Sequence, residues 1–179
     1  VSGADAPDDL SPAWLPDGRS LLFSSDRIGP RSVFRVSFLG GSPSLVVEDA
    51  AEPAVSDDGT VLAFTRTVGS GRYRRIWVAP FAAPDDARAM TTDEDGLWDH
   101  ARPAISPDGR RLCYADFRNL WIVDLPGGRP RPLTSDDAFD TEPRFSPDGR
   151  HVYFTSRRGD VVAVWAVPAS GGEAVRITG

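Results

Sequence analysis

The sequence predicts an all-β fold, a β-propeller made of four four-stranded antiparallel blades. The first observation behind this prediction is a turn that occurs four times, as LPDG at 15–18, SDDG at 56–59, and SPDG at both 106–109 and 146–149. The second is its spacing, because the turn glycines Gly18, Gly59, Gly109 and Gly149 lie 41, 50 and 40 residues apart. Repeats of about 40–50 residues are typical of propeller blades.

The turn is predicted to join the first two strands of each repeat. Proline fixes φ at a turn corner, aspartate bonds to the backbone just ahead of it, and glycine takes the positive φ that closes the hairpin. The first strand carries a proline and, two positions later, an apolar residue on the same face; the pairs are Pro12 and Trp14, Pro53 and Val55, Pro103 and Ile105, and Pro143 and Phe145. The second strand carries two large residues, also two positions apart, namely Leu21 and Phe23, Leu62 and Phe64, Leu112 and Tyr114, and Val152 and Phe154.

The third and fourth strands repeat as well. The third contains one aromatic residue in each of the segments VFRV, IWVA, LWIV and VWAV. A Gly-Gly turn follows at 40–41, 127–128 and 171–172, with Ala82–Ala83 in its place in the second repeat, and a short last strand ends in Met-Thr, Leu-Thr or Ile-Thr in the last three repeats. We therefore expect a single propeller domain or fragment over 1–179, with blades at about 10–50, 51–95, 100–135 and 140–179.

The stacking of the sheets follows from the same pattern. The 17 glycines and 16 prolines recur along the chain, and no segment has a helical period, so short strands are favoured. Sheets that are apolar on both faces must pack against other sheets. Radial stacking buries both faces and leaves only short edges.

The segments EPRFSPDGRHVYF (142–154) and ARPAISPDGRRLCY (101–114) show the repeat most clearly. This pattern resembles the PD-repeat of TolB-like β-propellers over about residues 10–179. The resemblance implies a non-catalytic scaffold that binds a protein, peptide or other ligand in the bacterial envelope, in a periplasmic or extracytoplasmic location. Similar repeats also form the propeller that gates substrate access in prolyl-oligopeptidase-type serine peptidases, and sensor domains of larger regulatory proteins.

The resemblance also bears on the number of blades. TolB-like propellers usually have about six blades, whereas this sequence contains four repeats and both starts and stops between repeats. The expectation is an arc of a larger propeller, with other domains of a longer parent chain among its partners. A closed four-bladed ring and closure by self-association are the alternatives.

Composition excludes several classes of partner. The formal net charge is −6 and there is no basic tail, which argues against nucleic-acid and anionic-membrane partners because both require a positive surface. The longest apolar run, Val161–Val167, is far shorter than the roughly 20 residues that span a bilayer, so no direct membrane insertion is expected. No signal peptide is visible.

The connectors between blades provide the candidate site, because in propellers they lie near one mouth of the central channel. Six polar residues are expected to gather at this rim and to bind a ligand or peptide: Asp99, His100, Arg102, Asp140, Glu142 and Arg144. The alternative is a solvated, charge-paired loop. The RYRR segment (72–75) could similarly bind an acidic peptide or be a solvated loop tip.

No catalytic motif accompanies these residues. There is no G-x-S-x-G elbow, HExxH, CxxC or phosphate-binding loop. With two histidines and one cysteine, a His- or Cys-rich metal site is not expected, and the acidic segments 93–99 and 135–140 are predicted to be solvated turns rather than calcium loops. The sequence therefore predicts no enzyme activity, cofactor or metal. His151 is expected at the surface and Cys113 in the core.

Overall fold

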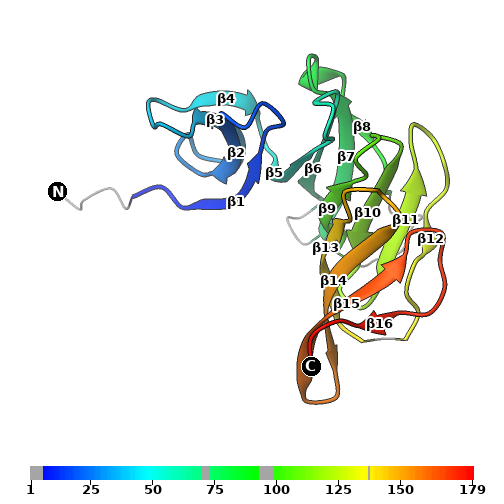
Figure 1. Cartoon of the computed structure of the whole chain (residues 1–179). Helices are drawn as coiled ribbons and strands as arrows, with labels where there is room; N and C mark the ends of the chain where they lie inside the picture. Colours follow the sequence, from blue (N-terminus) through cyan, green and yellow to red (C-terminus); the bar gives the residue numbers. More distant parts are fainter. Residues whose placement is uncertain (1–5, 70–72, 93–98, 137) are drawn as a thin grey trace.

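The structure is a computed structural model that describes residues 6–69, 73–92, 99–136 and 138–179. It consists of four antiparallel sheets of four strands each, with the strands of every sheet in sequence order, as predicted (Figure 1). Blades 1 and 2 comprise β1 (Asp9–Trp14), β2 (Ser20–Ser25), β3 (Ser32–Ser37), β4 (Ser44–Val47), β5 (Ala51–Val55), β6 (Val61–Val68), β7 (Tyr73–Pro80) and β8 (Arg88–Ala89). Blades 3 and 4 comprise β9 (Ala101–Ile105), β10 (Arg111–Ala115), β11 (Leu120–Asp124), β12 (Arg131–Pro132), β13 (Asp140–Phe145), β14 (His151–Arg158), β15 (Val161–Pro168) and β16 (Val175–Arg176).

The four copies of the turn do join the first two strands of each blade. In blade 2 the Ser56 hydroxyl donates a hydrogen bond to Asp58 Oδ1 (2.6 Å) and accepts one from the Val61 N–H (3.0 Å). Blades 3 and 4 repeat these bonds, and blade 1 has a leucine in place of the serine. The serine hydrogen bond is the main reason that the pKa of Asp58 is lowered. Gly59 adopts a φ of +71°, which explains the glycine at this position of the repeat.

The threonine that ends each of the last three repeats also has a structural role. Its hydroxyl accepts a hydrogen bond from a backbone N–H of the third strand, from Ile76 to Thr91 (2.9 Å), from Leu120 to Thr134 (2.9 Å) and from Val164 to Thr178 (3.0 Å). The bond fastens the end of each blade to its own third strand.

The hydrophobic core lies between the blades. Leu22 and Val33 of blade 1 pack against Leu62 and Phe64 of blade 2. Equivalent clusters join blade 2 to blade 3 and blade 3 to blade 4. Cys113 is fully buried in the last of these clusters, where burial raises the pKa of its thiol.

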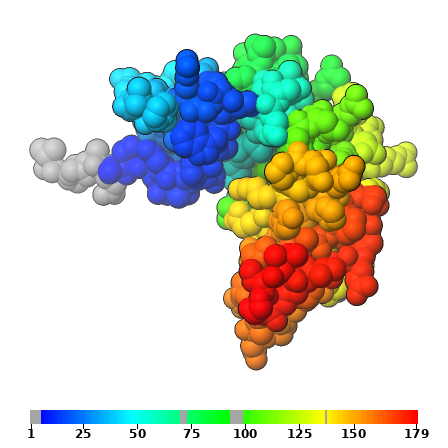
Figure 2. All heavy atoms as spheres, in the orientation of Figure 1, coloured from blue at the N-terminus to red at the C-terminus, as the bar shows by residue number. Residues whose placement is uncertain are grey.

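The blades follow one another in an open arc, with the chain termini on different blades (Figure 1). Among the described residues, the core clusters connect only consecutive blades. Blade 1 and blade 4 project in different directions from the middle of the molecule (Figure 2). No helix in the described part of the chain is long and apolar enough to cross a bilayer.

Candidate functional site

The first strand of each blade has a bulge at the residue before its proline. These residues are Ser11, Glu52, Arg102 and Glu142, and their φ values are 52°, 51°, 56° and 55°. A left-handed backbone costs roughly 1–2 kcal/mol for a residue other than glycine, and a residue before proline usually prefers an extended conformation. Bulges redirect side chains, and all four of these residues line one cleft.

The cleft has a volume of about 1270 Å³ and runs along the first strands of the four blades. Polar side chains come from the bulges, while four residues at equivalent positions near the turns add an apolar and aromatic wall: Trp14, Val55, Ile105 and Phe145. The cleft therefore has charged and apolar zones, the combination found in binding sites for peptides and other extended ligands.

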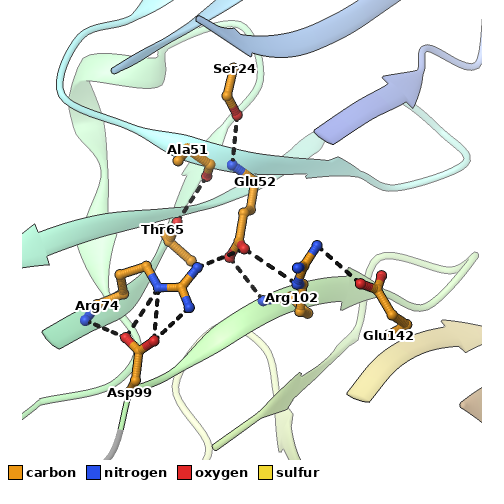
Figure 3. A network of polar contacts seen from close by, with 8 residues as sticks. All are labelled: Ser24, Ala51, Glu52, Thr65, Arg74, Asp99, Arg102 and Glu142. Carbon is orange, nitrogen blue, oxygen red and sulfur yellow. Dashed lines mark hydrogen bonds and ion pairs between the residues drawn. The ribbon is translucent and has the colours of Figure 1, made fainter. Parts of the chain in front are cut away.

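Glu52 is the centre of an ion-pair network in this cleft (Figure 3). Its carboxylate is 2.7 Å from Arg74 Nη1 and 3.4 Å from Arg102 Nε, and it also accepts the backbone N–H of Arg102 (3.0 Å). Its own N–H donates to Ser24 Oγ (2.9 Å). Through its backbone and its side chain, which is only 10% exposed, this one residue links blades 1, 2 and 3.

The network continues in both directions from Glu52. Arg74 donates to Asp99 from its backbone (2.7 Å) and its guanidinium (2.5 Å). Burial alone would raise the pKa of Asp99, but these bonds and the charge of Arg74 hold it below its ordinary value. On the other side, Arg102 Nη1 is 3.0 Å from Glu142 Oε1. Acidic and basic groups therefore alternate from Asp99 to Glu142, across blades 2 to 4.

The six residues proposed from the sequence lie in two environments. Asp99, Arg102 and Glu142 belong to the network, and Arg144 is exposed and lines the cleft. His100 and Asp140 are only 2% and 1% exposed. Their backbone N–H groups bond to the preceding blade, from His100 to Arg74 O (3.2 Å) and from Asp140 to Arg118 O (2.9 Å). These two residues therefore lie in the seams between blades.

Sequence reasoning did not select Glu52, although a signal for it was present. Glu52 precedes Pro53 just as Arg102 precedes Pro103, so comparing the repeats at this position would have identified it. The sequence predicts a loop for Arg74, either as part of a site for an acidic peptide or as a solvated tip, whereas Arg74 lies on β7 and reaches into the cleft. Of the same RYRR segment, Arg75 is buried (2% exposed) with its guanidinium over the Tyr73 ring, and Arg72 lies outside the described residues.

The described residues include only part of the two acidic segments, 93–99 and 135–140. Residues 93–98 lie outside the described residues, and Asp99 is held by Arg74. Within 135–140, Asp136 pairs with Arg158 at 2.5 Å. Across the described parts of the chain, no three His, Cys, Asp or Glu side chains are grouped to hold a metal ion.

The fold and the cleft define an open arc of β-propeller blades with a charged cleft along their first strands. The TolB β-propeller domain family (PD40) matches residues 53–179. The chain therefore belongs to this family, and the resemblance drawn from the repeats is confirmed.

Relatives of this chain include TolB proteins and peptidases. It is 30% identical over 179 residues to the uncharacterised protein Atu1656 of Agrobacterium fabrum, covering 94% of the chain and 57% of that relative. It is 30% identical over 152 residues to a TolB homologue of Chlorobium luteolum (79% and 32% covered) and 28% identical over 149 residues to the uncharacterised peptidase YuxL of Bacillus subtilis (81% and 21%). The chain thus spans less than two thirds of the length of each of these relatives.

Solved structures show the same fold. A protein assigned to TolB from Agrobacterium tumefaciens superimposes with a TM-score of 0.81 at 28% identity, covering 97% of this chain and 62% of the other. The TolB of Acinetobacter baumannii gives a TM-score of 0.79 at 21% identity, covering 96% of this chain and 44% of the other.

Proposed function

We propose that this domain is a non-catalytic scaffold of TolB-like type, which binds a protein or peptide partner in its central cleft. The observation that carries the proposal is the set of four bulge residues. Each holds an unfavourable backbone conformation, and each directs its side chain into the same cleft. Strained backbone persists where the surrounding structure enforces it, and it is concentrated at functional sites.

The chemistry of the cleft supports a macromolecular ligand. It is large and open, it alternates charge along its length, and it offers exposed Trp14 at one wall. A rigid scaffold with charged and aromatic groups along a groove suits an extended peptide chain. The net charge of −6 makes nucleic acid an unsuitable partner.

The parent protein is part of the same proposal. We infer that the four blades belong to one domain of a larger propeller of about six blades, in a periplasmic or extracytoplasmic location. The greater lengths of the related proteins support this inference. Other domains of a longer chain are then natural partners.

Site-specific photo-crosslinking tests the cleft. The cross-linker p-benzoylphenylalanine is placed at Trp14, inside the cleft, and as a control at Leu39, which is 82% exposed outside it. In an extract of the source cells, position 14 is expected to give a defined adduct that position 39 does not give. Identical adducts from both positions would show that the cleft is not the binding surface.

An accessory propeller of a serine peptidase is the second candidate, with the role of gating access to a catalytic domain. Two relatives support this candidate. One is YuxL, and the other is a tricorn protease homologue (homologue 2) of Streptomyces coelicolor. The chain is 44% identical to the latter over 71 residues, which cover 39% of the chain and 6% of that relative. Labelling the full-length protein with a fluorophosphonate discriminates the two candidates. A peptidase reacts through its active serine, and a TolB-like scaffold does not.

A further inference from the structure

An arginine stacks on two aromatic rings in both blade 1 and blade 2. In blade 1 the guanidinium carbon of Arg27 is 5.0 and 4.9 Å from the ring centres of the aromatic residues on the second and third strands. In blade 2 the guanidinium carbon of Arg66 is 5.1 Å from the ring centre of Phe64 and 5.0 Å from that of Trp77, which occupy the same two strands. Attraction between the cation and the rings favours this position of the guanidinium in both blades.

The stacked arginines of blades 1 and 4 each have a carboxylate partner. Arg27 Nε donates to Ser25 Oγ (3.0 Å), and its Nη2 donates to both carboxylate oxygens of Asp9 (2.9 and 3.0 Å). In blade 4, Arg158 stacks on the aromatic ring of the third strand and forms an ion pair with Asp136. A carboxylate therefore neutralises the stacked guanidinium in both of these blades.

Blade 2 lacks the residues that serve as these partners. Seven residues after the turn glycine, Arg66 itself occupies the position that Ser25 has in blade 1. Nine residues before the turn glycine, Ala50 occupies the position of Asp9. The connector before blade 2 is also shorter than the connector before blade 4, which supplies Asp136. The sequence of blade 2 thus provides a stacked arginine without its carboxylate.

The polar atoms around Arg66 agree with this comparison. Arg66 Nε and Trp77 Nε1 are buried, and neither has a hydrogen-bond partner within the part of the chain that the structure describes. No ion pair of Arg66 is present among the same residues. Arg66 is only partly buried, and its terminal nitrogens reach solvent at the seam between blades 1 and 2. Because these blades are consecutive, no additional blade can cover this seam.

We propose that the stacked guanidinium of Arg66 binds the side-chain carboxylate of an acidic residue on a partner protein. Aspartate supplies this group to the equivalent guanidinium within blade 1. The planar fork of arginine can donate two parallel hydrogen bonds to one carboxylate. The aromatic rings hold the guanidinium in place, so less conformational entropy is lost on binding. This inference rests on the proposed scaffold role, but it concerns a second contact outside the cleft, because Arg66 does not line the cleft.

Nuclear magnetic resonance of the indole N–H groups tests this proposal, because each of the five tryptophans gives one signal. The signal of Trp77 is identified by its loss in Trp77→Phe. The blocked peptide acetyl-Gly-Asp-Gly-amide should shift it with half-saturation at about 10–100 mM, as expected for one charge-assisted contact. Acetyl-Gly-Asn-Gly-amide is the uncharged control and should not shift it. The indole N–H of Trp121, which donates to Asp116 Oδ2 (2.6 Å), should respond to neither peptide.

Three variants locate the response. Arg66→Gln removes the charge at a partly exposed position and should abolish the shift. Ala50→Asp places a carboxylate where blade 1 has Asp9, so it should pair with Arg66 and abolish the shift while the arginine is kept. Arg88→Gln is the matched control, because Arg88 is an exposed arginine on the last strand of the same blade. It should change the half-saturation concentration by less than about twofold.

Three outcomes would overturn the inference. The first is equal shifts with the two peptides, and the second is the absence of a saturable shift of the Trp77 signal. The third is a shift that persists in Arg66→Gln or in Ala50→Asp. None of these outcomes would remove the proposed peptide-binding cleft, which the cross-linking experiment at Trp14 tests separately.

Discussion

The faces between blades and the open face of blade 4 are built from equivalent positions, yet they differ in burial. At one position of the third strand, Val33, Ile76 and Leu120 are fully buried, whereas Val164 is 37% exposed. Burial at these positions thus depends on whether another blade follows. The repeat specifies an apolar face in every blade, but only a neighbouring blade converts this face into core.

On the open face of blade 1, two aromatic side chains are covered by an arginine. Phe23 and Phe34 point away from blade 2, but the guanidinium of Arg27 covers both rings at 5.0 and 4.9 Å. The two rings are only 9% and 3% exposed as a result. Blade 4 presents exposed Val162, Val164 and Val175 instead. The two ends of the arc therefore differ in how these apolar side chains are covered.

The largest expected effect compares one substitution at two equivalent positions. Val33→Ala removes two buried methyl groups between blades 1 and 2 and should lower the free energy of unfolding by about 2.5 kcal/mol. Val164→Ala on the open face should cost less than about 1 kcal/mol. Urea denaturation measures both values. Equal losses would indicate that the open face of blade 4 is covered in solution.

The second prediction compares the ion pairs of Glu52 in the cleft with an exposed ion pair at the edge of blade 1. Glu52→Gln leaves Arg74 and Arg102 without their shared carboxylate in a partly buried site, and should destabilise the chain by about 1–2 kcal/mol. Asp9→Asn breaks an exposed pair with Arg27 and should cost less than about 1 kcal/mol. Thermal unfolding of both variants provides the comparison. A cost for Asp9→Asn that matched Glu52→Gln would contradict the role assigned to burial.

The fold was predictable because its signals are local and occur in every repeat. The turn, the paired strands and the final threonine each follow from residue types within a few positions of one another. The order of the blades then follows from the order of the repeats. This is why the sequence alone indicated four sheets correctly.

The site was less predictable, because it depends on how neighbouring blades meet. The sequence predicts His100 and Asp140 to be polar connector residues at the rim, but a connector crosses the seam before it reaches the cleft, and both residues are buried in that seam. Glu52 lies in an apolar stretch, and only its left-handed backbone directs it toward Arg74 and Arg102. Sequence patterns with a period of two do not reveal such a bulge.

The third prediction contrasts two carboxylates of blade 4. Burial raises the pKa of Asp140, whereas the hydrogen bond from Ser146 is the main cause that lowers the pKa of Asp148. A raised pKa in the folded state means that stability falls as the pH rises above the ordinary value of 3.8. Asp140→Asn should therefore raise Tm at pH 7, by about 2 °C, and the gain should vanish below about pH 4.

Asp148→Asn is expected to show the opposite sign. Because the pKa of Asp148 is lowered in the folded state, its ionised carboxylate stabilises the fold at pH values above the ordinary pKa of 3.8. This stabilisation is lost as the pH falls through the folded-state pKa. The variant should therefore have a lower Tm at pH 7 and approach the parent chain in acid. Scanning calorimetry from pH 3 to pH 8 measures both variants. If both variants changed Tm at pH 7 in the same direction, the difference between the buried carboxylate of the seam and the hydrogen-bonded carboxylate of the turn would be refuted.

The smallest expected effect concerns the hairpin between the second and third strands. Blades 1, 2 and 4 have a glycine with positive φ in this loop, whereas blade 3 has Phe117 at a φ of 82°. Phe117→Gly removes this strain, worth roughly 1–2 kcal/mol, but it also removes the edge-to-face contact with Phe139 and increases the entropy of the unfolded chain. The net change should be a stabilisation of about 0.5 kcal/mol.

Gly159→Ala in the same loop of blade 4 provides the reference for this small effect. Gly159 has a φ of 62°, and an added methyl group would meet no atom within 4 Å, so the substitution isolates the backbone cost. It should destabilise the chain by about 1 kcal/mol. If Phe117→Gly were also destabilising by this amount, the contact between the two exposed aromatic rings would outweigh the strain. The loop of blade 3 would then be stabilised mainly by the contact of Phe117 with Phe139 in the connector before blade 4, and not by the conformation of its own turn.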